Sequence, residues 1–159
     1  FAEVYAQILL LNPSYQEAYM GEVVDKKDEH RFYDYKTMLD ARITVTAGTD
    51  LPLFLTSVPD SIYAACKRLF PDGSPSGGWY PERGMPISEM LKAWTINGAR
   101  HQFMEDKTGS IEVGKYADIA VFDRNLFETP AEELRDVKVV LTIADGRIVY
   151  DTTRIKVSQ

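Results

Sequence analysis

The segment 42–48, which reads Arg-Ile-Thr-Val-Thr-Ala-Gly, constrains the fold more than any other part of this sequence. Its consecutive β-branched residues predict a strand, and β-branched residues on both faces predict burial on both sides, as in a parallel sheet. Residues 1–7 also read as a strand. Between the two, Asp34 is a candidate N-cap for a helix that runs to Ala41. Strand, helix and strand in this order predict a right-handed crossover between parallel strands.

The remainder of the first 107 residues alternates between helix and loop signals. A helix is predicted over residues 15–20, after an Asn-Pro-Ser turn. The charged run 25–31, Asp-Lys-Lys-Asp-Glu-His-Arg, predicts a solvated loop. Residues 71–86 are rich in Gly, Pro and Ser and predict a long loop, of a kind that is often functional or mobile.

Two further helices have clear apolar faces. Pro59 lies at the start of the first, whose apolar stripe consists of Ile62, Cys66, Leu69 and Phe70. Ser88 is the predicted N-cap of the second, whose apolar positions are Ile87, Met90, Leu91 and Trp94. We expect Cys66 to be a small buried residue rather than a reactive thiol, and Trp94 to belong to the helix core rather than to a pocket wall.

Strand signals dominate after Lys107. The predicted strands cover residues 111–113, 117–122, 137–143 and 147–150, with a short helix or turn over 128–134. Asp145-Gly146 is a strong signal for a type I′ hairpin between the last two strands. We therefore divide the chain into residues 1–107, residues 108–151 and a polar tail at 152–159.

Composition excludes several functional classes. The 159 residues carry 18 Lys and Arg against 24 Asp and Glu, a net charge of −6. An acidic chain without a basic stripe is a poor match for nucleic acid or an anionic membrane. No run of about 18 apolar residues is present, as a membrane span would need. A single cysteine excludes an internal disulfide.

The chain begins with Phe1, inside a strand-like run, so we expect it to be a piece of a longer protein. No signal peptide is visible at this terminus. The location in the cell is therefore unknown, and a cytoplasmic one is only the default expectation.

Asp50 is the leading candidate for a functional residue. It stands directly beyond the carboxyl end of the predicted buried strand, where parallel sheets and barrels hold their active sites. A carboxylate there can bind a metal ion or accept a proton from metal-bound water. Alternatively, Asp50 caps a turn with its own side chain.

No complete metal-binding or nucleophilic motif accompanies Asp50. His30 lies in the charged run and is expected at the surface, and His101 is expected to be structural or exposed. The sequence contains no His-x-His, Cys-x-x-Cys, Gly-x-Gly-x-x-Gly or Gly-x-Ser-x-Gly. A catalytic zinc usually takes three protein ligands, so Asp50 cannot hold one alone.

Four segments carry more specific motifs. They are Ala-Gly-Thr-Asp-Leu-Pro at 47–52, Thr-Ile-Asn-Gly-Ala at 95–99, Gly-Ser-Ile-Glu-Val-Gly-Lys-Tyr-Ala-Asp-Ile-Ala-Val-Phe-Asp at 109–123, and Leu-Thr-Ile-Ala-Asp-Gly-Arg-Ile-Val-Tyr at 141–150. In order, they resemble the Gly-Ser-Asp-x-Pro segment, the Thr-x-Asn-x-Ala helix end, the Gly-Ser-Ile-x-x-Gly-Lys-x-Ala-Asp stretch and the closing hairpin of the amidohydrolase superfamily. The chain is most similar to amidohydrolase family 3, whose members resemble N-acyl and N-formyl amide hydrolases.

The resemblance implies an α/β parent enzyme that combines a metal-dependent (β/α)8 TIM barrel with a small composite β-sandwich. Residues 1–107 would then be the carboxyl-terminal part of the barrel, and residues 108–151 the later sandwich strands. Asp50 matches the family's strand-eight aspartate, which binds a divalent metal, expected to be zinc, deprotonates the attacking water and protonates the leaving amine. The family's histidine ligands would lie upstream of Phe1, so this fragment need not bind a metal by itself.

The sequence departs from the family pattern at two places. Thr49 replaces the more usual Ser, and residues 101–104, His-Gln-Phe-Met, replace a small Ala-Leu-Gly-Leu, so packing there must differ. The candidates for substrate binding are Pro52, Trp79 and Tyr80. Trp79 and Tyr80 would cover the substrate pocket of the parent, or else simply pack in a solvated loop.

Two functional hypotheses follow. In the first, the chain is part of a metal-dependent amidohydrolase that cleaves a C–N bond in a small amide-like substrate, and the isolated chain is inactive. In the second, it is a non-catalytic structural or interaction module derived from that fold. In both, self-association or the missing amino-terminal part must cover the sheet edges. Neither hypothesis involves nucleic acid or a membrane.

Overall fold

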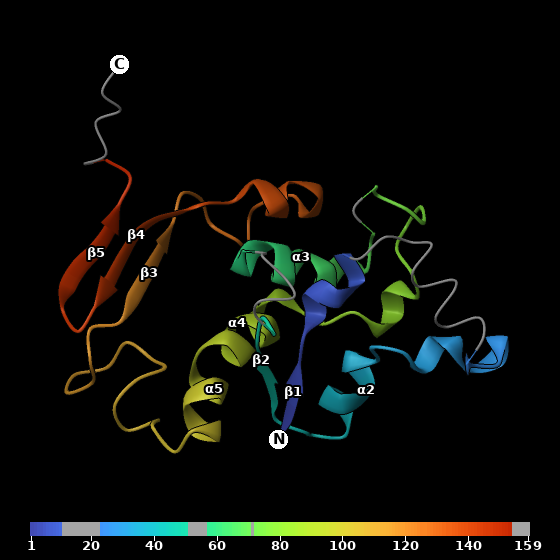
Figure 1. Cartoon of the computed structure of the whole chain (residues 1–159), viewed down its shortest axis with the longest axis horizontal. Helices are drawn as coiled ribbons and strands as arrows, with labels where there is room; N and C mark the ends of the chain where they lie inside the picture. The colour runs from blue at the N-terminus through green and yellow to red at the C-terminus, as the bar shows by residue number, and fades with distance from the viewer. Residues whose placement is uncertain (11–22, 51–56, 71, 154–159) are drawn as a thin grey trace.

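The structure is a computed structural model that describes residues 1–10, 23–50, 57–70 and 72–153. Figure 1 shows a body of short helices around a pair of strands, with a three-stranded sheet beside it. The amino terminus lies at the foot of the strand pair.

The strand pair is parallel, as predicted. Strand β1 (Ala2–Val4) and strand β2 (Val45–Ala47) are paired residue for residue. Val45 and Thr46 face opposite sides of β2 and are both buried, which confirms a strand buried on both faces. Both strands are shorter than predicted. The chain leaves β1 at Tyr5, whose carbonyl accepts the N–H of Ile8 and starts the 3₁₀ helix η1 (Ala6–Leu10).

After η1, the described part of the crossover between the strands contains the short helices η2 and α2. Residues 26–31 form the 3₁₀ helix η2 (Lys26–Arg31), which buries no side chain. The predicted loop is therefore wrong in conformation, although the charged run is solvated. Helix α2 (Tyr35–Asp40) begins as predicted, because the Asp34 carboxylate accepts the backbone N–H of Thr37 at 3.0 Å. The helix predicted over 15–20 lies outside the described residues.

Helix α3 (Val58–Lys67) begins with a capping box, in which Ser57 and Asp60 bond to each other's backbone N–H. Ile62 is fully buried, as predicted. The predicted apolar stripe is not contained in one helix, because Leu69 and Phe70 lie beyond the end of α3. The helix ends before them because Arg68 takes a left-handed conformation, with a φ of 52°.

Helices α4 (Ile87–Trp94) and α5 (Ile96–His101) follow the loop that contains the short 3₁₀ helix η3 (Pro81–Arg83). Ser88 is not the N-cap, because the Pro86 carbonyl already accepts the N–H groups of Glu89 and Met90. The predicted start of this helix is therefore wrong by two residues. Met90 is buried and Trp94 packs against the core, as expected, but Trp94 also lines a cavity and is therefore part of a pocket wall as well.

The second half of the chain forms an antiparallel sheet in the order β3 (Ile119–Phe122), β4 (Val139–Ala144) and β5 (Arg147–Asp151). Asp145 and Gly146 have φ values of 48° and 73°, which confirms the predicted type I′ hairpin between β4 and β5. The predicted helix or turn at 128–134 overlaps the 3₁₀ helix η4 (Ala131–Asp136), which packs on α3.

The strand predicted at residues 111–113 is wrong. Ile111 and Val113 are exposed, and the backbone turns as the N–H of Lys115 bonds to the Glu112 carbonyl. The Lys115 ammonium holds the turn by bonding to the Ser110 hydroxyl and the Glu112 carboxylate. Alternating side chains suggested a strand, but no neighbouring strand pairs with this segment in the described structure.

One core joins both halves of the chain. It contains strand residues, helix residues from α3 and α4, and residues that follow Lys107: Val4, Val45, Ile62, Ala65, Met90, Leu126, Leu134 and Val137. The division near Lys107 stays a prediction. What the core establishes is that the later residues help to hold α3 in place.

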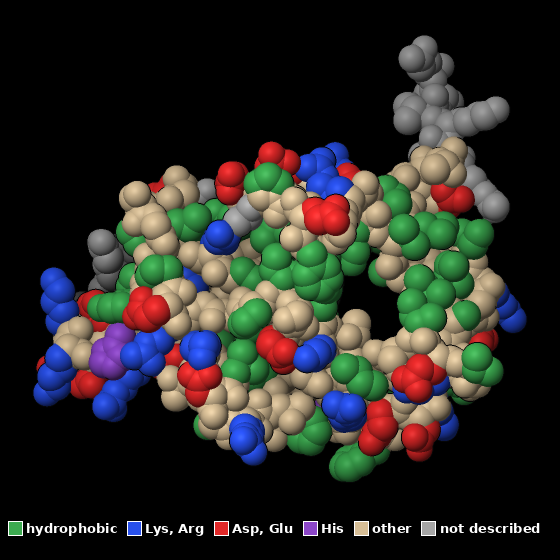
Figure 2. All heavy atoms as spheres, turned by 180° about the vertical axis from the view of Figure 1, so that it is seen from behind, with side chains coloured by type: hydrophobic (Ala, Val, Ile, Leu, Met, Phe, Trp, Pro, Cys, Tyr) green, Lys and Arg blue, Asp and Glu red, His purple; other side chains and the backbone are tan. Residues whose placement is uncertain are grey.

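The sheet and the helical body leave open apolar surface between them and on the sheet. Figure 2 shows an opening between the two parts, bordered by apolar side chains. A cavity of about 560 Å³ lies between α4–α5 and β3, with Trp94 and Phe122 among its lining. Val121, Val149 and Tyr150 are exposed on the sheet. In the described parts of the chain, no helix has the length and apolar character that a membrane crossing requires.

The single cysteine, Cys66, is half-buried rather than fully buried as predicted, and this partial burial allows a test. Burial raises the pKa of the Cys66 thiol to about 12, with the neighbouring Lys67 opposing it. Since the thiolate is the reactive species, we expect a thiol-reactive disulfide reagent at pH 8 to label the native chain at least about 100-fold more slowly than the guanidinium-unfolded chain. The chain has one cysteine, so the signal reports one site. Equal rates in the two states would contradict the burial.

Candidate active site

Asp50 lies at the carboxyl edge of the parallel strands. β2 ends at Ala47, and residues 48–50 lead away from it to an exposed Asp50. The φ of Asp50 is 53°, in the left-handed region that is costly for residues with a Cβ, although aspartate tolerates it better than most. Such strain persists only where the surroundings fix the backbone, and it is typical of functional sites.

Gly48 fixes the backbone just before Asp50. Its N–H donates to the Val4 carbonyl at 3.1 Å, which extends the parallel pairing past the end of β2. A Cβ at this position would lie 2.8 Å from Glu3 Oε1 and 2.9 Å from Tyr5 Cε1. The side chains of β1 and its exit therefore pack directly on Gly48, and only glycine fits without a shift.

The edge is acidic. The charge of Glu3 is the main cause that raises the pKa of the Tyr5 phenol, followed by burial, the hydrogen bond between the two side chains and the charge of Asp50. Glu3 and Tyr5 were not predicted as site residues. Their spacing of two residues could have indicated them, because alternate residues of a strand and of the segment that follows it face the same side.

Two buried polar residues, Gln7 and Ser61, are connected to this edge by hydrogen bonds. The sequence analysis did not predict them as site residues. The Gln7 amide donates to the Gly48 carbonyl at 2.8 Å, and its oxygen accepts the Ser61 hydroxyl at 3.2 Å. Because these residues are far apart in sequence, no local pattern identifies the group.

The described residues do not hold a metal ion by themselves. No group of three or more His, Cys, Asp or Glu side chains with suitable placement exists among them. Asp50 fits a single ligand position of a larger site, since a carboxylate oxygen is an ordinary donor for zinc and other divalent metals.

The other residues considered from the sequence lie away from Asp50 or outside the residues that the structure describes. The ring of His101 stacks on Phe1, with 5.3 Å between centroids, and His30 packs edge-on against Tyr80 at 6.3 Å. His101 thus has a structural contact, as expected, whereas His30, which was expected at the surface, is half-buried beside Tyr80. Pro52 falls outside the described residues.

Trp79 is held by a buried arginine at the end of α3, and Tyr80 follows it in the same loop. Arg68 is fully buried, and its guanidinium donates to the carbonyls of Trp79 and Tyr33 at 2.6 Å and of Phe32 at 3.1 Å. Its Cζ lies 5.0 Å from the centre of the Trp79 ring, and its own carbonyl accepts the Trp79 N–H. The loop around Trp79 is therefore fastened to α3. Whether these rings contact substrate stays a prediction.

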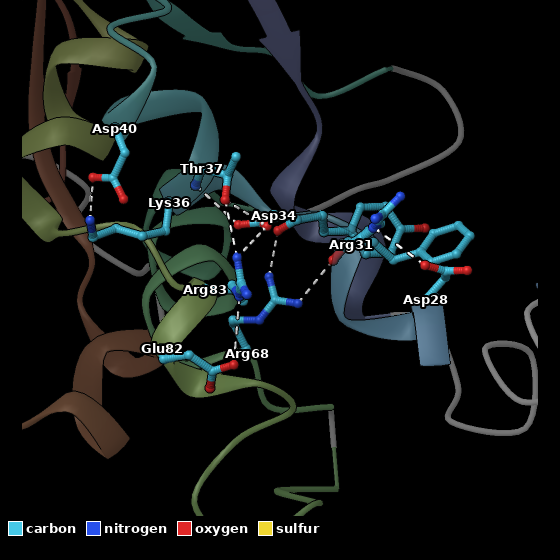
Figure 3. A network of polar contacts seen from close by, with 11 residues as sticks. Asp28, Arg31, Asp34, Lys36, Thr37, Asp40, Arg68, Glu82 and Arg83 are labelled. Carbon is cyan, nitrogen blue, oxygen red and sulfur yellow. Dashed lines mark hydrogen bonds and ion pairs between the residues drawn. The ribbon is translucent and has the colours of Figure 1, made fainter. Parts of the chain in front are cut away.

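A second arginine extends this network toward α2, as Figure 3 shows. Arg83 pairs with the Asp34 carboxylate at 2.8 Å and also bonds to the Thr37 hydroxyl. Burial tends to raise the pKa of Asp34, but the hydrogen bonds from Thr37 and the charge of Arg83 outweigh it and lower the pKa. The helix cap and the loop are thus coupled through one carboxylate.

Comparison with known proteins places the chain in a family. A sequence profile described as "Amidohydrolase family" matches residues 5–150. The chain belongs to the amidohydrolase family. This confirms the resemblance to amidohydrolase family 3. Enzymes of this family generally use a divalent metal.

Two curated relatives illustrate the range of the family. This amidohydrolase chain is 31% identical over 138 residues to N-substituted formamide deformylase from Arthrobacter pascens, covering 84% of the chain and 25% of the relative. It is 35% identical over 86 residues to 5-methylthioadenosine/S-adenosylhomocysteine deaminase from Thermoanaerobacter pseudethanolicus, covering 48% of the chain and 20% of the relative. The chain thus spans a quarter or less of the length of these relatives.

Solved structures show the same fold class. The crystal structure of an amidohydrolase from Thermotoga maritima MSB8 superimposes with a TM-score of 0.52 at 22% identity, covering 75% of this chain and 26% of that one. The likeness confirms the expected α/β class. Amidohydrolases of this fold combine a TIM barrel with a β-sandwich, and which residues of this chain belong to each stays a prediction.

The Arg68 network gives a stability prediction. Arg68→Met leaves three part-buried backbone carbonyl groups without their donor, so we expect a loss of about 2–3 kcal/mol in the free energy of unfolding, measured by denaturant titration. Trp79 emission should also shift to the red as its ring becomes solvated. The control is Arg31→Met, which removes an exposed ion pair with Asp28 and should have little effect. Similar losses for the two variants would contradict the anchoring role.

Proposed function

We propose that this chain contributes part of the active site of a metal-dependent amidohydrolase that hydrolyses a non-peptide C–N bond in a small, amide-like molecule. The observation that carries the proposal is Asp50, an exposed carboxylate in a strained backbone at the carboxyl edge of a buried parallel strand. Family membership supports it, since two relatives are named a formamide deformylase and a deaminase, and both names denote changes at C–N bonds.

In this proposal, Asp50 has two roles. One carboxylate oxygen binds the metal, with the other ligands supplied from outside the described residues. The carboxylate also accepts a proton from the attacking water while the oxygen of that water bonds to the substrate carbon. It then returns the proton to the leaving nitrogen as the C–N bond breaks. A divalent metal, which we propose to be zinc, would supply Lewis acidity when bound.

The remaining parts of the chain have supporting roles in the same proposal. Residues 1–107 belong to the barrel, residues 108–151 belong to the sandwich, and residues 152–159 are a polar tail. Pro52, Trp79 and Tyr80 are candidate substrate contacts. The exposed apolar side chains of the sheet, Val121, Val149 and Tyr150, support a role for further protein, or a second copy, in covering that surface.

The test is Asp50→Asn in the complete enzyme, assayed on a panel of N-formyl and N-acetyl amines. Asparagine keeps the size of the side chain and tolerates the left-handed backbone, so the fold should persist. Loss of the proton-transfer group should lower kcat by 10²-fold or more. The isolated 159-residue chain should show no turnover.

A matched control is Asp72→Asn, which changes another exposed turn aspartate, one that bonds to Ser74. We expect this variant to retain turnover within about twofold, as for most surface substitutions. Near-normal turnover by Asp50→Asn would contradict the assigned role, and would favour the alternative of a non-catalytic structural or interaction module.

A further inference from the structure

Gln7 has an unusual position for an uncharged polar residue. It lies in η1, immediately after β1, and its side chain is fully buried. A buried amide is costly unless both its donor and its acceptor have partners. Here the nitrogen donates to the Gly48 carbonyl at 2.8 Å, and the oxygen accepts the Ser61 hydroxyl at 3.2 Å. Gln7 thus links α3 to the exit of β2.

The bond from Gln7 completes the restraint of Gly48. The N–H of Gly48 already donates to the Val4 carbonyl at 3.1 Å, so both backbone polar groups of this residue are bonded to the segment 4–7. Fixing the Gly48 carbonyl fixes the orientation of the peptide plane that leads to Thr49. Asp50 follows one residue later in its costly left-handed conformation, which requires such outside restraint.

We propose that Gln7 is a positioning residue for Asp50, which acts through the Gly48 carbonyl and is itself oriented by Ser61. The proposal rests on the function proposed for Asp50. In it, the buried amide holds the backbone so that the Asp50 carboxylate faces the substrate side of the sheet edge. Gln7 does not touch the substrate.

The chain offers a matched control in Asn97. This residue of α5 is also a buried amide, and its nitrogen donates to the Val45 carbonyl of the same strand at 3.0 Å. Its bond restrains β2 well before the exit toward Asp50. A purely structural role for Gln7 predicts that the two residues behave alike, whereas a positioning role predicts that they differ.

The experiment compares Gln7→Met and Asn97→Leu in the complete enzyme, on the same N-formyl and N-acetyl amines. Both variants should lose stability. Gln7→Met should lower kcat about 10-fold or more with little change in KM, because small misplacements of a catalytic group are costly, while Asn97→Leu should change kcat less than about threefold. In an Asp50→Asn background, Gln7→Met should cost little further activity, since the two residues act as one unit.

A readout without activity uses the 159-residue chain. The NMR coupling between the amide and α protons of residue 50 reports its φ, and Gln7→Met should change it while Asn97→Leu leaves it unaltered. If Gln7→Met does not fold, Ser61→Ala takes its place, because it removes only the bond that orients the amide. The change in φ should then be smaller but in the same direction.

The two proposals can fail separately. An unchanged φ at residue 50 in the Gln7→Met chain, or equal kcat losses for Gln7→Met and Asn97→Leu, would overturn the role of Gln7. Near-normal turnover by Asp50→Asn would overturn the proposed function instead. In that case, a change in the φ of residue 50 would still show that Gln7 restrains the backbone, but this restraint would have no role in catalysis.

Discussion

The parallel pairing of β1 with β2 is the constraint on which the rest of the structure depends. Parallel strands need a long crossover, and here residues 5–44 provide it. The pairing also places both carboxyl ends at one edge, so that Glu3, Tyr5 and Asp50 share it. Because the Val4 carbonyl binds the N–H of Gly48, the pairing continues past β2 and reaches the turn that leads to Asp50.

Local signals predicted the elements whose cause is local. The β-branched run of 42–48 identified a strand buried on both faces, Asp34 identified a helix start, and Asp145-Gly146 identified a hairpin. In each case the energy comes from neighbouring residues: packing of branched side chains, a side-chain cap, or a turn that favours positive φ.

Two of the errors depend on partners that are distant in the sequence or missing. Residues 111–113 alternate like a strand, but pairing needs a neighbour and a turn formed instead. The apolar stripe of α3 seemed to continue through Phe70 because sequence does not reveal that Arg68 turns back to bond the carbonyls of residues 32, 33 and 79. The place of Asp50 beyond a strand end was predictable from the sequence, whereas its role stays a prediction. Gln7 and Ser61 were not predictable, because 54 residues separate them.

Two buried polar side chains, Arg68 and Gln7, thus connect different segments of this chain to α3. Arg68 fastens the loop that carries Trp79 and Tyr80 to the end of α3, and Gln7 fastens the exit of β2 to the body of the same helix. Both act on backbone carbonyls rather than on other charges. Helix α3 is therefore the common support of the candidate catalytic residue and of the aromatic candidates for substrate binding.

The central claim is that Asp50 is a metal ligand of the complete enzyme. The most direct measurement is a crystal structure of that enzyme loaded with zinc, with the metal located by anomalous scattering. The account predicts an Asp50 oxygen about 2.0–2.2 Å from a metal at the carboxyl edge of the barrel strands. A metal bound without Asp50, with this carboxylate instead turned back onto its own backbone to cap the turn, would contradict it.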